Sequence, residues 1–267
     1  MVPRTGSRHM RLPPASCFCP GVAPLVRRGF LLAGGRGPRQ PKALASGDAG
    51  PLIASRRCRP YIADVPRTPF IEPSAPILGC EPPRGREWLH EVKHDGWRAQ
   101  LHKAGDDVVI YSKTGADFTK RFRTIADAVL RLPANSCILD VELVACDQSG
   151  NPNFDELMRG ARHGCCAWCF DLLELDGTNH TMAPLEYRRH LLSKLLKRVK
   201  SDTLRMSENF RDPIALLRAA ETHGLEGIVS KLKADRYRSG KNPGWIKVKT
   251  AAWRAANRAR WEMFQSL

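Results

Sequence analysis

The chain has 267 residues, 42% of them hydrophobic and 26% charged, which fits one domain of ordinary size that can bury a core. A membrane-spanning helical protein is excluded, because no apolar run is long enough to cross a bilayer. The net charge of +16 favours a polyanionic partner, with nucleic acid ahead of a membrane.

The first segment of the chain carries most of this charge. Residues 1–69 hold 12 Lys or Arg and 2 Asp or Glu, a net charge of +10, so the remainder carries +6. Residues 1–66 are rich in Pro, Gly, Ala and Arg and show no sustained period of 2 or 3.6, which predicts a disordered basic tail. A transit peptide, an expression remnant or a misassigned start remain alternatives for this segment.

The rest of the chain predicts an α+β domain over residues 67–252, with order beginning near Pro69. Alternating apolar residues indicate strands, and apolar spacings of three and four indicate helices. We expect strands at 87–93, 97–102, 108–112, 137–146, 167–173, 227–231 and 245–249, and helices at 119–132, 184–199, 213–223 and 253–264. Asp95 and Gly96 mark a turn, and Gly224 is typical of a helix C-terminal cap. Mainly antiparallel sheets flanked by helices follow from this order.

The chain contains nine cysteines, an odd number without a compact spacing. Reduced thiols in the cytoplasm are therefore the simplest interpretation. Cys166 and Cys169 form a lone C-x-x-C, and a zinc site needs a second pair at suitable spacing. We expect both to be buried as small apolar side chains.

Several charged residues lie in or beside the apolar strand patterns, where burial is costly unless the charge is paired or used. They are Lys93, Glu142, Glu226, Lys247 and Lys249.

Lys93 lies at a strand end, directly before the turn at Asp95 and Gly96. A nucleophilic amine must be uncharged, and desolvation and neighbouring cations favour loss of its proton. Lys247 and Lys249 are two residues apart on one strand, so they share a face and can supply such cations. The alternative is a surface hairpin, with the other two lysines in water.

Three carboxylates and an aromatic ring are further candidates for binding a ligand or a metal. Asp140 and Glu142 share a strand face and can bind a metal or a ribose, or pair with a nearby arginine. Glu226 suits Mg²⁺, which is often held by one or two carboxylates plus phosphates; the alternative is a solvated helix-to-strand junction. Phe170 can stack on a base, or simply pack in the core.

The order of these signals resembles the nucleotidyltransferase motifs of ATP-dependent DNA ligases. The motifs are Lys93 to Arg98, Asp140 to Glu142, Phe170 and Asp171, Glu226 to Lys231, and Lys247 to Lys249, with supporting stretches at 70–73, 114–122, 207–208 and 237–240. Residues 69–250 look like the adenylation domain of that family, especially the ligase module of bacterial end-joining ligases. The resemblance implies a nucleotidyltransferase fold of the ATP-grasp-like type.

The resemblance also implies the chemistry. Lys93 would attack the α-phosphate of ATP, with Mg²⁺ or Mn²⁺, to form lysyl-AMP and release pyrophosphate. The AMP would pass to a 5′-phosphate of nicked double-stranded DNA, and a 3′-hydroxyl would seal the nick. An RNA ligase, another nucleotidyltransferase, or a non-catalytic nucleic-acid-binding relic of the fold are the alternatives.

Individual roles follow from the matched positions. Glu91 would border the adenine, and Phe170 would stack on it. Arg98 would contact the sugar and phosphates, Glu142 would lie near the ribose and the metal, and Glu226 would bind the metal. Lys247 and Lys249 would hold the α-phosphate. Lys113 replaces a usual arginine and loses its bidentate geometry. Val141 replaces a usual glycine; this β-branched residue can crowd the pocket, although it fits a strand well.

The 18 residues after Lys249 predict only a C-terminal helix over 253–267. The family normally continues with an OB-fold domain, so we expect no such domain here and a separate OB-fold or end-joining protein as a possible partner. The resemblance places the protein in a bacterial cytoplasm at the nucleoid, with no membrane partner.

Overall fold

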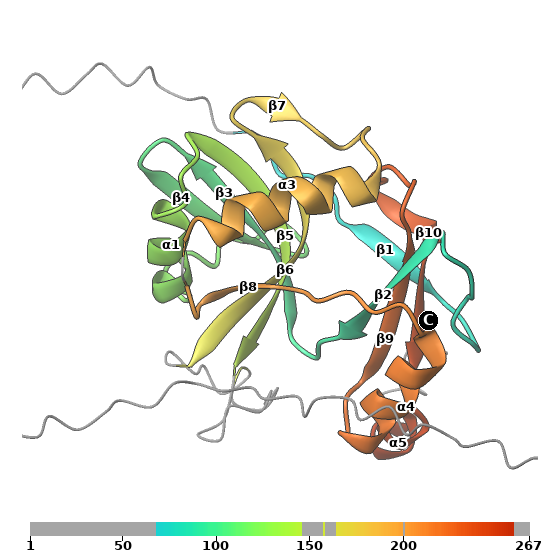
Figure 1. Cartoon of the computed structure of the whole chain (residues 1–267). Coiled ribbons are helices and arrows are strands. Elements are labelled where there is room, and N and C mark those ends of the chain that lie inside the picture. Colours follow the sequence, from blue (N-terminus) through green and yellow to red (C-terminus); the bar gives the residue numbers. More distant parts are fainter. Residues whose placement is uncertain (1–67, 146–156, 158–163, 200, 259–267) are drawn as a thin grey trace, which may run out of the picture. The chain divides into compact units, whose positions relative to one another are not determined.

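The computed structural model describes residues 68–145, 157, 164–199 and 201–258, which belong to one unit (Figure 1). The predicted disordered tail at 1–66 and the end of the predicted terminal helix lie outside the described residues. Among the residues that are described, no helix is long and apolar enough to cross a membrane.

One sheet has the strand order β1-β10-β9-β2. Its members are β1 (Ser74–Leu78), β10 (Gly240–Lys249), β9 (Gly227–Leu232) and β2 (Trp88–Lys93). β1 runs parallel to β10, and the other pairs are antiparallel. Helix α4 (Pro213–Thr222) covers one face through Leu216 and Ala220, which contact Ile228 and Val248. The opposite face is left for the second sheet.

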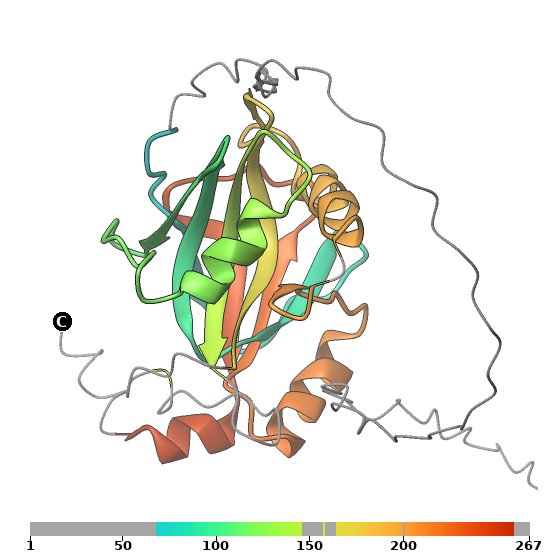
Figure 2. The same cartoon turned by 90° about the vertical axis from the view of Figure 1, so that its left-hand side faces the viewer.

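The second sheet has the order β4-β3-β5-β6-β7, and β8 pairs with β6. Its members are β4 (Asp107–Ser112), β3 (Trp97–Ala104), β5 (Ser136–Ala145), β6 (Cys165–Leu175), β7 (Thr178–Asn179) and β8 (Leu204–Met206). Helices α1 (Arg123–Leu130) and α3 (Leu185–Lys197) pack on one face, around Leu101 and Leu139 (Figures 1 and 2). The confirmed architecture is α+β with mainly antiparallel sheets flanked by helices.

A smaller apolar cluster joins the inner faces of the two sheets. It contains Leu89, Ile138, Phe170, Leu173, Leu185, Tyr237 and Trp245. Fully burying one such side chain contributes about 1.5–3 kcal/mol. Beyond this cluster the inner faces carry charged residues, which places the site described below between the sheets.

Several predicted boundaries were wrong, for local reasons. The helix expected at 119–132 spans only Arg123–Leu130, because Thr119 is engaged elsewhere: its hydroxyl accepts from the backbone N–H of Ile110, and its own N–H donates to Asp117. Helix α5 (Ala251–Ala256) starts before the expected Trp253, because the Thr250 side chain caps it. Strands β1, β7 and β8 were not predicted, and β10 begins five residues early, with Pro243 falling in an irregular stretch of its pairing with β1.

Candidate active site

A cleft of about 480 Å³ opens to solvent between the two sheets. It is lined by Pro76, Glu91, Val92, Lys93, His94, Arg98, Glu142, Phe170, Ser207, Val229, Lys231 and Trp245. The structure thus brings five of the predicted site residues into one cavity: Glu91, Lys93, Arg98, Glu142 and Phe170.

Two predicted lysines lie in one row across three strands. Lys93 of β2 and Lys249 of β10 both pair with Gly227 of β9, so all three share the inner face of the sheet. A side chain at Gly227 would overlap the carbonyl oxygen of Val248 and would lie 2.8 Å from the Cα of Lys249. The glycine therefore allows β9 and β10 to approach closely at the site.

Glu226 connects the two lysines of this row. Its Oε2 lies 2.6 Å from the Nζ of Lys93, and its Oε1 lies 3.1 Å from the Nζ of Lys249. The Glu226 side chain is 5% exposed and that of Lys93 is 23% exposed. The surface-hairpin and solvated-junction alternatives were therefore wrong, and Lys93 faces the cleft with a buried carboxylate beside it.

Lys247 lies two residues before Lys249 on β10, beside the row of Lys93 and Lys249. It pairs with Val229 and shares the face of Lys249, as predicted. Burial lowers the pKa of Lys247, and the charges of Lys93 and Lys249 lower it further, whereas Glu226 opposes this shift. Lys113 is exposed, and its charge also acts on Lys247. Such a density of cations favours a ligand with several negative charges.

The two carboxylates of β5 have different surroundings. Asp140 is fully buried and accepts two hydrogen bonds from Arg98, at 2.9 and 2.7 Å, and one from the Tyr237 hydroxyl at 2.6 Å. Of the two interpretations that the sequence left open, Asp140 shows the pairing with an arginine. It holds the Arg98 guanidinium at the cleft.

Glu142 is the carboxylate that lines the cleft. Within the described part of the chain it makes no hydrogen bond or ion pair. Burial raises its pKa to about 7, with Glu226 and Asp140 adding to the rise and Lys93 and Arg98 opposing it. A carboxyl group whose pKa is raised by burial and by neighbouring carboxylates favours a cation beside it.

The donor set fits magnesium rather than a closed metal cage. In the described ranges, no group of three or more His, Cys, Asp or Glu residues could hold a metal ion. Glu142 lines the cleft, and Glu226 contacts the cleft residue Lys93. Mg²⁺ typically uses one or two carboxylates while keeping waters and substrate phosphates.

Phe170 belongs to both the core and the cleft. It occupies an irregular position in β6, between the residues that pair with Asp140 and Val141. The ring packs in the cluster between the sheets, and the guanidinium carbon of Arg98 lies 5.0 Å from its centroid. The Lys231 Nζ lies 4.2 Å from the same centroid. Phe170 therefore packs in the core and also lines the cleft.

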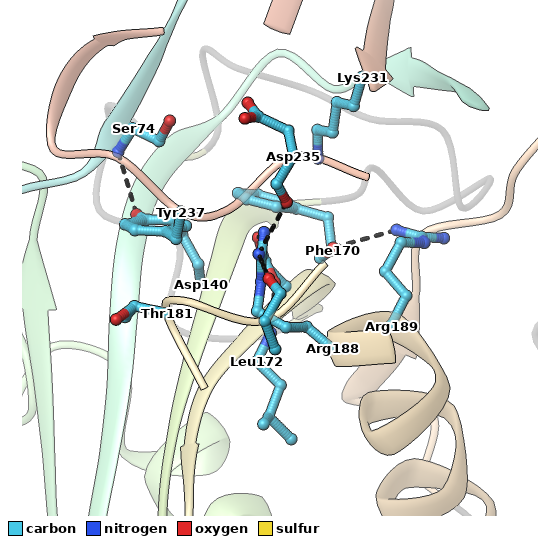
Figure 3. A network of polar contacts seen from close by, with 12 residues as sticks. Ser74, Asp140, Phe170, Leu172, Thr181, Arg188, Arg189, Lys231, Asp235 and Tyr237 are labelled. Atoms are coloured by element: carbon cyan, nitrogen blue, oxygen red, sulfur yellow. Dashed lines mark hydrogen bonds and ion pairs between the residues drawn. The ribbon is translucent and has the colours of Figure 1, made fainter. Parts of the chain in front are cut away.

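A buried ionic network under the cleft was not predicted. Glu91 binds Arg189 through one oxygen and Lys231 through the other, the latter at 2.7 Å. Arg189 also donates to the carbonyl oxygen of Phe170 at 3.0 Å (Figure 3). It donates to the carbonyl oxygen of Ser207 at 2.6 Å. Glu91 therefore shapes the wall of the cleft through these contacts. The spacing that predicted a helix at 184–199 gave no signal that Arg189 is buried.

A second buried pair lies beside this network. Arg188 binds both carboxylate oxygens of Asp171 at 2.8 Å, and both side chains are fully buried. Arg188 also donates to the carbonyl oxygen of Asp235 (Figure 3), and to that of Ala183. These contacts attach α3 to β6 behind Phe170.

His94 and Trp168 form a stacked pair at the cleft, also without a sequence signal. Their ring centroids are 4.4 Å apart with an interplanar angle of 15°. Burial lowers the pKa of His94 to about 4, and the charges of Lys93 and Lys231 act in the same direction. The imidazole is therefore uncharged at neutral pH.

Val141 does not crowd the cleft. It is fully buried in the core beneath α1 and α3, because successive strand residues point to opposite faces. Cys166 and Cys169 are buried, as predicted.

A lysine with further cations nearby, in a cleft that lies between two mostly antiparallel sheets and that an aromatic ring also lines, is the arrangement expected of a covalent nucleotidyltransferase. The family described as "ATP dependent DNA ligase domain" matches residues 79–249. The chain belongs to this family, which confirms the resemblance inferred from the order of the motifs.

Two curated relatives illustrate the extent of the similarity. A probable DNA ligase of Beutenbergia cavernae is 33% identical over 85% of this chain and 47% of its own length. The multifunctional non-homologous end joining protein LigD of Pseudomonas aeruginosa is 35% identical over 68% of this chain and 23% of its own length. The chain therefore spans about half or less of the length of these relatives.

Solved structures of ligase domains are also similar to this chain. The ligase domain of M. tuberculosis LigD has a TM-score of 0.58 and 28% identity, covering 66% of this chain and 60% of that one. A mycobacterial DNA ligase D complexed with ATP and MES has a TM-score of 0.56 and 27% identity, with the same coverage of both chains.

Proposed function

We propose that this chain is a DNA-ligase-type nucleotidyltransferase in which Lys93 takes AMP from ATP. The observation that carries the proposal is the contact of Lys93 with Glu226, which also holds Lys249, in a cleft shared with Phe170. The Lys93 nitrogen forms a bond to the α-phosphorus while the bond from that phosphorus to the pyrophosphate oxygen breaks. Lysyl-AMP and pyrophosphate are the products.

The ammonium of Lys93 must lose a proton before it attacks. Glu226 Oε2, at 2.6 Å, is the group in contact with this ammonium and suited to accept that proton. Lys249 and Lys247 would bind the α-phosphate and stabilise the charge on its oxygens during transfer. A divalent cation, Mg²⁺ or Mn²⁺, bound by Glu226 and Glu142 would neutralise charge on the departing pyrophosphate.

The nucleoside would occupy the side of the cleft nearer the apolar cluster. Phe170 offers a π face to the adenine, and the buried Glu91 network supports the carbonyl of that residue through Arg189. Arg98, fixed by Asp140, would contact the sugar and phosphates. Lys113 would add a more distant charge at the phosphate end.

The acceptor we propose is nicked double-stranded DNA. AMP would pass to its 5′-phosphate, and the 3′-hydroxyl would displace AMP and seal the strand, in the bacterial cytoplasm at the nucleoid. Membership of the ligase family and the similarity to LigD support this choice. Assistance from a separate OB-fold or end-joining protein is part of the proposal. An RNA acceptor is the alternative, which a comparison of nicked DNA with nicked RNA distinguishes.

The test is mass spectrometry of the protein after incubation with ATP and magnesium. We expect a mass gain of one AMP on the peptide that contains Lys93, and its loss in Lys93→Ala. Lys120→Ala, which removes an exposed lysine outside the cleft, is the matched control and should retain the adduct. Absence of the adduct from the wild-type protein, or its persistence in Lys93→Ala, would contradict the proposal.

A further inference from the structure

Helix α5 places an aromatic ring on one of the site lysines. The helix begins two residues after Lys249, and the Lys249 Nζ lies 3.6 Å from the centroid of the Trp253 ring. Trp253 is half-buried. The family match ends at residue 249, so this helix and its tryptophan lie beyond the matched domain.

Helix α5 is attached to the segment that carries Glu226. The Thr250 N–H donates to the carbonyl oxygen of Glu226 at 3.0 Å, and the Thr250 hydroxyl donates to that of Leu225 at 2.9 Å. The Glu221 carboxylate accepts from the first two backbone N–H groups of the helix, at 2.9 and 2.8 Å. The position of Trp253 is therefore fixed relative to Glu226 as well as to Lys249.

These contacts enclose the Lys249 ammonium from two directions. Glu226 Oε1 lies 3.1 Å from its nitrogen, and the indole presents its electron-rich face. A lysine side chain has four rotatable bonds, so ordering it in advance removes part of the entropy loss on ligand binding. Because an ammonium has three donors, it can keep the ring contact while a phosphate oxygen joins or replaces the carboxylate.

We propose that Trp253 is a positioning residue that holds Lys249 ready for the α-phosphate, so that α5 is part of the nucleotide site. This inference rests on the proposed function for the identity of the ligand. It extends the site to an element that follows the last recognised strand. Trp253 acts through Lys249 and not on the nucleotide itself.

Equilibrium binding of α,β-methylene-ATP tests the inference without the chemical step. Trp253→Leu should weaken binding by roughly threefold to thirtyfold, the range of a tryptophan cation–π contact. Trp253→Phe keeps an aromatic face and should fall between the wild type and Trp253→Leu. Arg254→Ala changes an exposed charge on the same helix and should bind as the wild type does. Equal binding by Trp253→Leu and Arg254→Ala would overturn the inference.

A double-mutant cycle separates positioning from packing. In a Lys249→Met background, Trp253→Leu should cause no further loss of affinity, because the ammonium that it positions is gone. The same loss in both backgrounds would show that Trp253 only packs α5, and would overturn the inference. Thermal unfolding of each variant shows whether it folds. If Trp253→Leu does not fold, Trp253→Phe takes its place in the same cycle.

The outcome is independent of AMP transfer. Wild-type protein that binds the analogue but forms no lysyl-AMP from ATP would contradict the proposed function, while the cycle would still decide the role of Trp253. Wild-type protein that does not bind the analogue would overturn this inference.

Discussion

Individual buried residues away from the cleft also have measurable consequences, and His102 is the clearest. It lies on β3 and is 8% exposed. Its Nε2 is 3.1 Å from the side-chain oxygen of Gln100, and its ring meets that of Tyr111 edge-on at 4.9 Å. Burial lowers the pKa of His102 to about 4. The folded state therefore holds this imidazole neutral at a pH where an unfolded chain would protonate it.

This shift predicts acid destabilisation with a defined sign. An unfolded histidine has a pKa of about 6.5, so between that pH and about 4 the unfolded chain binds a proton that folded His102 does not. The free energy of unfolding is therefore unaffected by His102 above about pH 6.5 and declines as the pH falls to about 4. The largest loss in free energy of unfolding from this shift is about 3 kcal/mol. His102→Phe keeps a ring but cannot titrate, so its free energy of unfolding should fall less over this interval. Urea unfolding at several pH values measures this.

A matched control for that experiment is His190→Phe, which introduces the same ring at an exposed position of α3. The prediction is contradicted if His102→Phe and the wild type lose the same free energy of unfolding between about pH 6.5 and 4.

At the scale of elements, strand β9 depends on Gly227. A methyl group there would overlap the backbone of β10 at Val248 and Lys249. Gly227→Ala should therefore separate β9 from β10, lower the free energy of unfolding by about 1–3 kcal/mol and reduce lysyl-AMP formation strongly. Denaturant unfolding and AMP labelling measure the two effects.

Gly105 provides the comparison, because it also has a positive φ, of 57°, but no atom lies within 4 Å of a methyl group built there. Gly105→Ala should cost about 1–2 kcal/mol from backbone strain and leave AMP labelling intact. Equal labelling by the Gly227 and Gly105 variants would show that close approach of β9 and β10 is not required for the chemistry.

The elements that the sequence predicted are those with strong local patterns. The alternating strands β2, β3, β4 and β9 and helices α3 and α4 were expected at nearly their observed positions. Strands β1, β7 and β8 form through pairing with distant partners and have five, two and three residues, too few for a period to show.

The site was predictable where spacing fixes a shared face and not where distant segments meet. Lys247 and Lys249 share a face because they are two residues apart. By the same rule Asp140 and Glu142 share a strand face, so the sequence did not distinguish their roles. Tyr237, which lies 97 positions along the chain from Asp140, binds Asp140 and not Glu142. Arg189 reaches Glu91 across 98 positions, and no local pattern reports such a contact.

For the molecule as a whole, the cleft lies between the two sheets, beside the apolar cluster that joins their inner faces. Lys93, Lys247 and Lys249 come from the first sheet, and Arg98, Glu142 and Phe170 come from the second. A nucleotide that contacts both sets would bridge the sheets. Binding should therefore stabilise the folded state, since the unfolded chain offers no such site.

The unfolding temperature measures this coupling. At α,β-methylene-ATP of about 100 times its Kd, mass action adds about 2.7 kcal/mol, which corresponds to roughly 5–10 °C for a domain of this size. Phe170→Leu removes the π face offered to adenine, so it should lower affinity and reduce the rise at the same concentration. Its unfolding temperature without nucleotide is the reference for that variant. If the analogue bound tightly but raised the unfolding temperature equally in Phe170→Leu and the wild type, adenine would not occupy the side of the cleft formed by the second sheet.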